Sequence, residues 1–224
     1  MTLPLLYSLQ HCPYAMRARM GILMANQQVR LRAIKTKNKP PHLLEMSPKG
    51  TVPVLILENG QVIDESLDIM LWALKENDPF NLLYSHDNHA LKNMLALIHL
   101  NDYEFKPALE IYKMSARKKN PDIEAHRNDC EIFIALFEEK LTQHKYLFGN
   151  EKSLVDYAIL PFIRQFARVE RRWYLESEYT HVQAWLNEFL QAPGSAQLFT
   201  KVMAKYDLWM DCGEEFIFNN QVKK

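Results

Sequence analysis

The sequence predicts an α/β region followed by an all-helical region. Up to about residue 77, short apolar runs typical of strands alternate with helical patterns in the order β, α, β, α, β, β, α. After residue 88, apolar residues recur almost entirely at helical spacing. The first pattern predicts an α/β domain with a mixed four-stranded sheet. We therefore expect domains at 1–77 and 88–224, joined by a linker at 78–87.

The composition is that of an ordinary globular protein. The 224 residues are 48% hydrophobic and 24% charged, enough to bury a sizeable core. Lys plus Arg and Asp plus Glu balance at 27 each, so we expect no broad electrostatic interface with nucleic acid or an anionic membrane. Three cysteines do not make a disulfide framework, which predicts a reducing, cytoplasmic compartment. No apolar run approaches the ~18 residues of a membrane span.

Local signals place the elements of the first region. Strands are expected at 3–8, 29–34, 54–57 and 61–64. The Glu-Asn-Gly sequence at 58–60 is a strong hairpin signal between the last two. Helices are expected over 15–25 and after Ser66, which is a suitable N-cap.

The junction between the first strand and the first helix carries a candidate nucleophile. Proline is favoured in the first turn of a helix, so Pro13 places Cys12 at the N-cap. The sulfur then lies near unpaired N–H groups and the positive end of the helix dipole. Both effects favour the thiolate, which is the nucleophilic form. We expect Arg17 and Arg19, further along this helix, to be solvated charges, and His11 to be an exposed loop residue.

The motifs of this region resemble those of the glutathione transferase family. The sequences HCPYAMRAR at 11–19, KNKP at 37–40, GTVPVL at 50–55 and DES at 64–66 follow that family's order at plausible separations. The Cys-Pro-Tyr-Ala tetrapeptide and the KNKP loop are most similar to the cysteine-type omega class. The resemblance implies a thioredoxin-like N-terminal domain and an all-α C-terminal domain. Over the C-terminal half the similarity is architectural.

The resemblance assigns roles in glutathione binding to individual residues. Cys12 would form a mixed disulfide with glutathione, Tyr14 would line the binding site, and Lys39 would reach the glycyl carboxylate. Other transferases of the family use a tyrosine or serine at or before the first helix turn. Tyr7 and Ser8 therefore remain rivals to Cys12, although Cys12 is better placed at the helix cap.

Two further motifs would hold the rest of the tripeptide. Pro53 would be cis, and the Val52 backbone would pair with the cysteinyl part of glutathione, as a peptide pairs with an exposed strand. Glu65 would hold the γ-glutamyl amine, and Ser66 the γ-glutamyl carboxylate. A carboxylate at the start of a helix meets free N–H groups and a favourable dipole.

A second glutathione is expected to resolve the mixed disulfide. Dithiol oxidoreductases have another cysteine at the fourth position of the tetrapeptide, where this chain has Ala15. Cys130 shares an apolar helical stripe and is expected in the core. The surroundings of Cys212 are undetermined from sequence.

The helical region is expected to form the acceptor site. By resemblance, that site lies where the helical domain faces the reactive cysteine, and Tyr103, Tyr112 and Trp173 are candidates for its wall. Ser153 and Asp156 form a capping box before an apolar stripe, which we interpret as structural.

We therefore expect a glutathione-dependent thiol transferase that reduces mixed disulfides or dehydroascorbate. The alternatives are glutathione conjugation to electrophiles and a non-catalytic scaffold or regulatory protein on the same fold. Glutathione is the expected co-substrate and no metal is expected. The resemblance also implies a homodimer. The balanced charge and the lack of a membrane-spanning apolar run predict no nucleic-acid or membrane partner.

Overall fold

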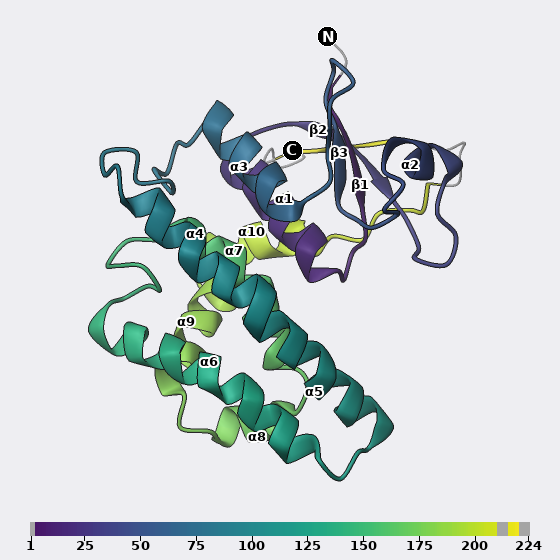
Figure 1. Ribbon diagram of the computed structural model, residues 1–224. Coiled ribbons are helices and arrows are strands. Elements are labelled where there is room, and N and C mark those ends of the chain that lie inside the picture. Colours follow the sequence, from purple (N-terminus) through teal and green to yellow (C-terminus); the bar gives the residue numbers. More distant parts are fainter. Residues whose placement is uncertain (1–2, 210–214, 220–224) are drawn as a thin grey trace. The chain divides into compact units, whose positions relative to one another are not determined.

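The computed structural model describes residues 3–209 and 215–219, which form two compact units. One unit contains the described residues of Met1–Phe80 and of Gln197–Lys224, and the other is Asn81–Ala196 (Figure 1). The sequence pattern placed residues 88–224 in one helical domain, whereas the structure groups the described residues after 196 with the sheet. The end of the chain therefore contributes to the unit that carries Cys12.

The first unit is built on a mixed sheet with one strand more than predicted. The four predicted strands are present, and a C-terminal strand makes five, in the order β4-β3-β1-β2-β5. β1 is parallel to β2, and the other pairings are antiparallel. The strands are β1 Leu5–Ser8, β2 Val29–Ala33, β3 Val54–Ile56, β4 Val62–Ile63 and β5 Phe216–Phe218. The predicted hairpin joins β3 to β4, with Gly60 at a φ of 84° in its turn.

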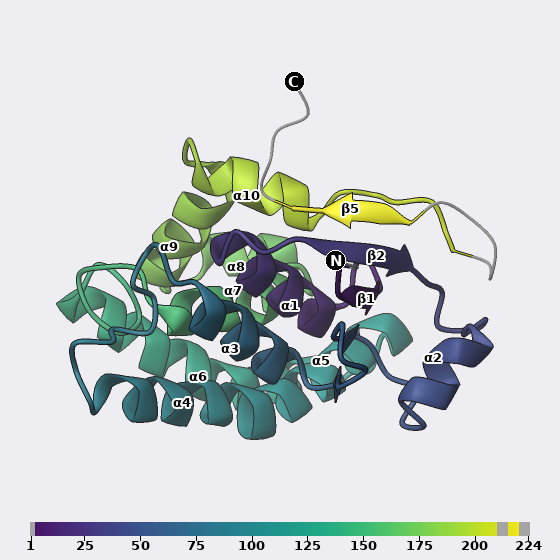
Figure 2. The same cartoon turned by 90° about the horizontal axis from the view of Figure 1, so that it is seen from above.

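The prediction of four strands missed β5 because its partner is remote in sequence. β5 lies along the free edge of β2, where Val29 pairs with Phe218 (Figure 2). Glu215, directly before β5, accepts hydrogen bonds from Arg30 (2.9 Å) and Arg32 (2.7 Å). The sheet edge is thereby covered by a segment about 185 residues away along the chain.

The first helix is enclosed on all sides. The helices of this unit are α1 Pro13–Met24, α2 Pro41–Met46 and α3 Ser66–Glu76, together with all but the first two residues of α10 Ser195–Val202. α1 packs against α3 so closely that a Cβ added to Gly21 would lie 2.6 Å from the Met70 Cα. Every residue of α1 except Tyr14 is buried, including Arg17 and Arg19. The prediction that these arginines are solvated is therefore wrong, because α1 presents no open face to water.

The second unit is helical throughout its regular structure. Its elements are α4 Ala90–Leu100, the π-helical segment η1 Asn101–Phe105, α5 Lys106–Lys118, α6 Ile123–Gln143, α7 Leu154–Phe166, α8 Arg171–Glu176 and α9 Thr180–Gln191. α4, η1 and α5 form one continuous rod (Figure 1). Only Lys106 separates the π-helical segment from Pro107, which lacks an N–H for regular helix bonding. None of the helices in the described ranges combines the length and hydropathy of a bilayer-spanning segment.

The predicted capping box of α7 is confirmed and extends into a buried network. Asp156 is fully buried, and one of its carboxylate oxygens accepts from the Ser153 hydroxyl (2.8 Å) and the Ser153 N–H (2.9 Å). The other oxygen accepts from the Leu147 N–H (3.0 Å) and the Trp185 indole (2.9 Å). The residue is thus structural, as its sequence context predicted.

We expect Asp156→Asn to lower the free energy of unfolding by about 2–4 kcal/mol. Four groups donate to the Asp156 oxygens, and three of them, the N–H groups of Leu147, Ser153 and Trp185, cannot accept, so the amide of Asn would turn its own N–H groups toward at least one of these donors. Urea denaturation measures the change. Asp129→Asn is the matched control, because the Asp129 side chain is 67% exposed, and it should change stability little. Equal stability of the two variants would contradict the structural role.

We expect the attachment of β5 to weaken in acid. Burial raises the pKa of Glu215, but the hydrogen bonds and charges of Arg32 and Arg30 outweigh it, so the pKa lies below its usual value. Such a group stabilises the fold above its unfolded pKa of about 4.3, and this contribution is lost as pH falls through the lower folded value. Hydrogen exchange of Phe216–Phe218, corrected for intrinsic rates, should show protection at neutral pH that declines below about pH 4. Glu215→Gln should reduce the protection and flatten its pH profile, and an unchanged profile would contradict the prediction.

Candidate functional site

Cys12 occupies the position that the sequence predicts. It is the N-cap of α1, with an extended backbone (φ −75°, ψ 122°), and Pro13 begins the helix. The thiol is free and partly exposed. The first turn of α1 makes no hydrogen bond to the sulfur; the thiol instead contacts the Val52 carbonyl oxygen at 3.8 Å. A neutral thiol is a donor, so it turns toward a carbonyl rather than toward the N–H groups of the helix.

The contact with Val52 brings the second predicted motif to the cysteine. The Val52–Pro53 peptide bond is cis, which confirms the expectation from the family resemblance. Residues 40 positions apart in sequence therefore meet at the sulfur. The main chain of Val52 lies where a peptide bound beside Cys12 would find backbone partners.

The start of α3 is backed by a buried cation. Ser66 is the first residue of α3 and is buried. Its hydroxyl accepts a hydrogen bond from Arg17 (3.5 Å), whose side chain is among the most deeply buried in the protein at 1% exposure. The Arg17 guanidinium also lies 5.8 Å from the centre of the Tyr14 ring. The Arg17 guanidinium thus places a positive charge beside the N-terminus of α3, which itself favours an anion.

The two remaining predicted residues, Lys39 and Glu65, both approach the loop before Pro53. Lys49, in this loop, forms an ion pair with Glu65, whose side chain is 61% exposed. Lys39 is exposed and reaches the same loop, since a Cβ added to Gly50 would lie 3.3 Å from its Nζ. Glu65 is consequently already partnered by a cation, a contact that sequence reasoning did not anticipate.

A second buried arginine organises the loop in front of Cys12. Arg19 is 2% exposed and donates to the Ser8 hydroxyl and to main-chain carbonyls. The carbonyl acceptors are those of Leu9 (3.2 Å), Gln10 (2.7 Å) and Val202 (2.9 Å). Burial lowers the pKa of Arg19 to about 10, although the charges at Cys12 and Tyr206 act in the opposite direction. The residues just before Cys12 are therefore held by hydrogen bonds to the Arg19 guanidinium.

One signal in the sequence would have identified both arginines. Apart from Arg17 and Arg19, residues 15–25 are apolar or glycine on every side of the helix. A helix that is apolar all round is buried in a folded protein, and charges on it are buried with it. Such charges require hydrogen-bonding partners, which here come from the site itself.

Tyr7 and Ser8, the two alternatives to Cys12 as the reactive residue, form hydrogen bonds inside the protein. Tyr7 is fully buried, and its hydroxyl accepts a hydrogen bond from Arg32 (2.7 Å) and lies 2.8 Å from His42 Nδ1. Ser8 is also buried, with its hydroxyl held by Arg19. Both hydroxyl groups belong to internal networks, whereas the sulfur of Cys12 is partly exposed. The structure therefore favours the cysteine among the three candidates.

The environments of His11 and Cys130 agree with those expected from the sequence. His11 is exposed, as expected. Cys130 is fully buried, and burial together with the charges of Asp129 and Glu131 raises the pKa of its thiol to about 12. It is thus an inert core thiol. Cys212 lies outside the described residues.

The three residues expected to form the acceptor wall have different environments within the second unit. Tyr103 is 68% exposed and stacks on His99, with 4.2 Å between ring centres. Tyr112 is fully buried and donates to Glu170 (2.9 Å), so its side chain is part of the core. Trp173 is half-buried, and the Arg127 guanidinium lies 4.4 Å from its ring centre. Across the described ranges, no group of three or more His, Cys, Asp or Glu side chains is arranged for a metal ion.

Two family models match the chain. Residues 6–80 match the N-terminal domain of glutathione S-transferases, and residues 100–193 match their C-terminal domain. Among curated proteins, glutathione S-transferase omega-1 of Mus musculus is 28% identical over 188 residues, covering 84% of this chain and 76% of its own. The omega-1 protein of Sus scrofa is 25% identical over 194 residues, covering 86% of this chain and 78% of its own.

Solved structures share the fold. Glutathione transferase URE2P6 of Phanerochaete chrysosporium, in complex with oxidised glutathione, superposes with a TM-score of 0.77 at 17% identity. The match covers 90% of this chain and 96% of that one. The two matching domain models cover more than half of the sequence, in the same order as the two units of the structure. The chain belongs to the glutathione S-transferase family, and its sequence is similar to the omega class.

Proposed function

We propose that this protein is a glutathione-dependent thiol transferase with Cys12 as its nucleophile. The observation that carries the proposal is the partly exposed sulfur at the N-cap of α1, 3.8 Å from the Val52 carbonyl and beside the cis Pro53. The similarity to omega-1 transferases supports it. Homodimerisation and a cytoplasmic location stay predictions.

Glutathione would bind across the residues gathered around Cys12. Its cysteinyl part would pair with the Val52 main chain, and its γ-glutamyl carboxylate would meet Ser66 at the start of α3. Lys39 would reach the glycyl carboxylate. Glu65 would hold the γ-glutamyl amine, and its carboxylate would then contact both that amine and Lys49, its present partner. Tyr14, above the Arg17 guanidinium, would line the site.

The chemistry is two successive thiol–disulfide exchanges. The Cys12 thiolate attacks the glutathione sulfur of a mixed disulfide, so that a Cys12–glutathione bond forms while the acceptor leaves as a thiolate and takes up a proton. A second glutathione, as its thiolate, then attacks the glutathione sulfur of this bond. Glutathione disulfide leaves and the Cys12 thiolate is restored. The resolving thiol comes from outside, because Ala15 occupies the fourth position of the tetrapeptide and Cys130 is buried.

We expect Cys12→Ala to reduce thiol transfer by at least about 100-fold while glutathione binding persists, since only the nucleophile is removed. Incubation with glutathione disulfide, followed by intact mass measurement and peptide mapping, should show one glutathione on Cys12 in the wild type and none in the variant. Cys130→Ala is the matched control and should retain the adduct. Full transfer activity in Cys12→Ala would reject the proposal. Strong conjugation of aromatic halides with little thiol transfer would select a conjugating transferase, and absence of glutathione binding would select a scaffold.

We expect Ser66→Ala and Arg17→Lys each to raise the KM for glutathione about tenfold, as loss of one charge-assisted hydrogen bond predicts. The first change removes the hydroxyl that would donate to the γ-glutamyl carboxylate. The second replaces the guanidinium with an ammonium, which would no longer orient that hydroxyl in the geometry seen here. Cysteinylglycine, which lacks the γ-glutamyl group, supplies the control substrate, and its KM should stay unchanged. A similar rise for both substrates would indicate general damage and contradict the assigned role.

A further inference from the structure

The segment that follows α10 returns to the sheet and runs beside β2 (Figure 2). The main-chain N–H of Trp209 donates to the Ala33 carbonyl oxygen (2.9 Å), and Leu208 forms a β-bridge with Ala33. These are backbone interactions, so they hold Trp209 at the end of β2 independently of its side chain. A substitution at this position would therefore change the indole and leave the course of the main chain intact.

The indole of Trp209 completes a group of aromatic and charged side chains. The Arg32 guanidinium lies 3.9 Å from the centre of the indole, and the Tyr7 ring meets the indole edge-on, with 6.1 Å between ring centres. A guanidinium over an indole gains a cation–π attraction. Glu215 accepts from Nε of the same guanidinium (2.7 Å). Two residues of the C-terminal segment therefore fix the orientation of Arg32.

Arg32 connects this group to α2 through Tyr7. Its Nη1 donates to the Tyr7 hydroxyl (2.7 Å), and that hydroxyl lies 2.8 Å from Nδ1 of His42, the second residue of α2. Because the Tyr7 oxygen accepts from a cation, its own proton can be donated to His42 Nδ1. A hydrogen-bonded path thus joins β2, β1 and α2.

The position of α2 depends on the small core that Trp209 shares. Of the six residues of α2, Leu43 alone is buried, and Pro40 at the N-cap offers no side-chain hydrogen bond. Leu43 belongs to a core cluster with Tyr7, against which Val52 and Trp209 also pack. Helices this short are stable only through tertiary packing, so loss of the indole would loosen α2.

The placement of α2 matters for the proposed function because Lys39 comes directly before its N-cap, Pro40. We propose that Trp209 is a positioning residue for the glycyl end of glutathione. It acts through Arg32 and Tyr7 on α2, which holds Lys39 where the glycyl carboxylate would lie. Trp209 itself need not touch the tripeptide.

The first measurement is the kinetics of thiol transfer by the intact chain. We expect Trp209→Leu to raise the KM for glutathione about tenfold with kcat unchanged, as misplacement of one charged partner predicts. γ-Glutamylcysteine has no glycyl residue, so its KM should stay at the wild-type value. Equal rises in the two KM values, or a fall in kcat, would show general damage and would overturn the proposal.

A second variant tests the same path without opening the core. Tyr7→Phe keeps the ring and removes only the hydroxyl between Arg32 and His42. We expect the same selective rise in the KM for glutathione, by about threefold, as loss of a neutral hydrogen bond predicts. Hydrogen exchange of residues 42–46, measured without glutathione, should be faster in both variants than in the wild type. This measurement reports on α2 without any transfer activity.

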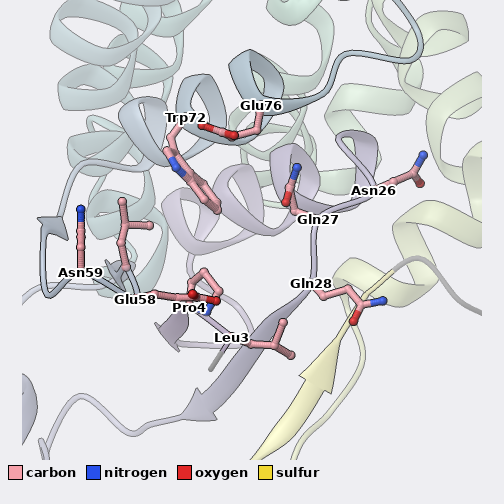
Figure 3. A pocket seen from close by; sticks show the side chains of 10 residues that line it. Leu3, Pro4, Asn26, Gln27, Gln28, Glu58, Asn59, Trp72 and Glu76 are labelled. Carbon is pink, nitrogen blue, oxygen red and sulfur yellow. The ribbon is translucent and has the colours of Figure 1, made fainter. Parts of the chain in front are cut away.

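Trp72→Leu is the matched control. Trp72 is another half-buried tryptophan of the first unit, on α3, where its ring lines a cavity of about 540 Å³ with Pro4 and Gln27 (Figure 3). None of these residues belongs to the path from Trp209 to α2. The control variant should leave both KM values and the exchange of α2 unchanged.

The inference rests on the proposed function, and the two fail in different measurements. A wild type that forms no glutathione adduct on Cys12 contradicts the transfer chemistry. Unchanged exchange of α2 in Trp209→Leu, or equal effects of Trp209→Leu and Trp72→Leu, contradicts the positioning role while the adduct still forms.

Discussion

The candidate site depends on two guanidinium groups buried in α1. A buried charge is tolerated only when hydrogen bonds surround it, so the segments that supply those bonds are held in place. Arg17 bonds to Ser66 and thereby ties α1 to the start of α3. Arg19 bonds to the loop in front of Cys12 and to the end of α10. The close packing of Gly21 against Met70 completes this framework by fixing the distance between α1 and α3.

The same framework accounts for the chemistry proposed for the site. Most of the charged groups in that chemistry are anions: the thiolate at Cys12, the two carboxylates of glutathione and the thiolate that leaves. The N-terminal ends of α1 and α3, with Arg17 and Arg19 behind them, concentrate positive potential where these anions would lie. The proposed site would thus use backbone dipoles and buried charges together, and only a few exposed side chains would need to contact the tripeptide.

The C-terminal segment gives the first unit features that a four-stranded sheet would lack. β5 covers the edge of β2 and is held by Glu215, which bonds to Arg30 and Arg32. Four residues between α10 and β5 line a cavity of about 420 Å³ beside the Cys12 loop, namely Ala204, Lys205, Tyr206 and Leu208. The cavity exists because the chain returns to the sheet after the helical unit.

Local chemistry was enough to predict the features that a few neighbouring residues control. Pro13 places Cys12 at a helix cap, Gly60 turns the β3–β4 hairpin, and Ser153 and Asp156 close a capping box; each depends on backbone bonds within one turn. The family motifs added the cis Pro53. Tertiary structure decided the other features. These are the burial of the α1 arginines, the fifth strand, the core position of Tyr112, and the grouping of the described residues after 196 with the sheet. These features depend on which remote segments exclude water from a side chain or pair with a strand edge, and residues adjacent in sequence do not carry that information.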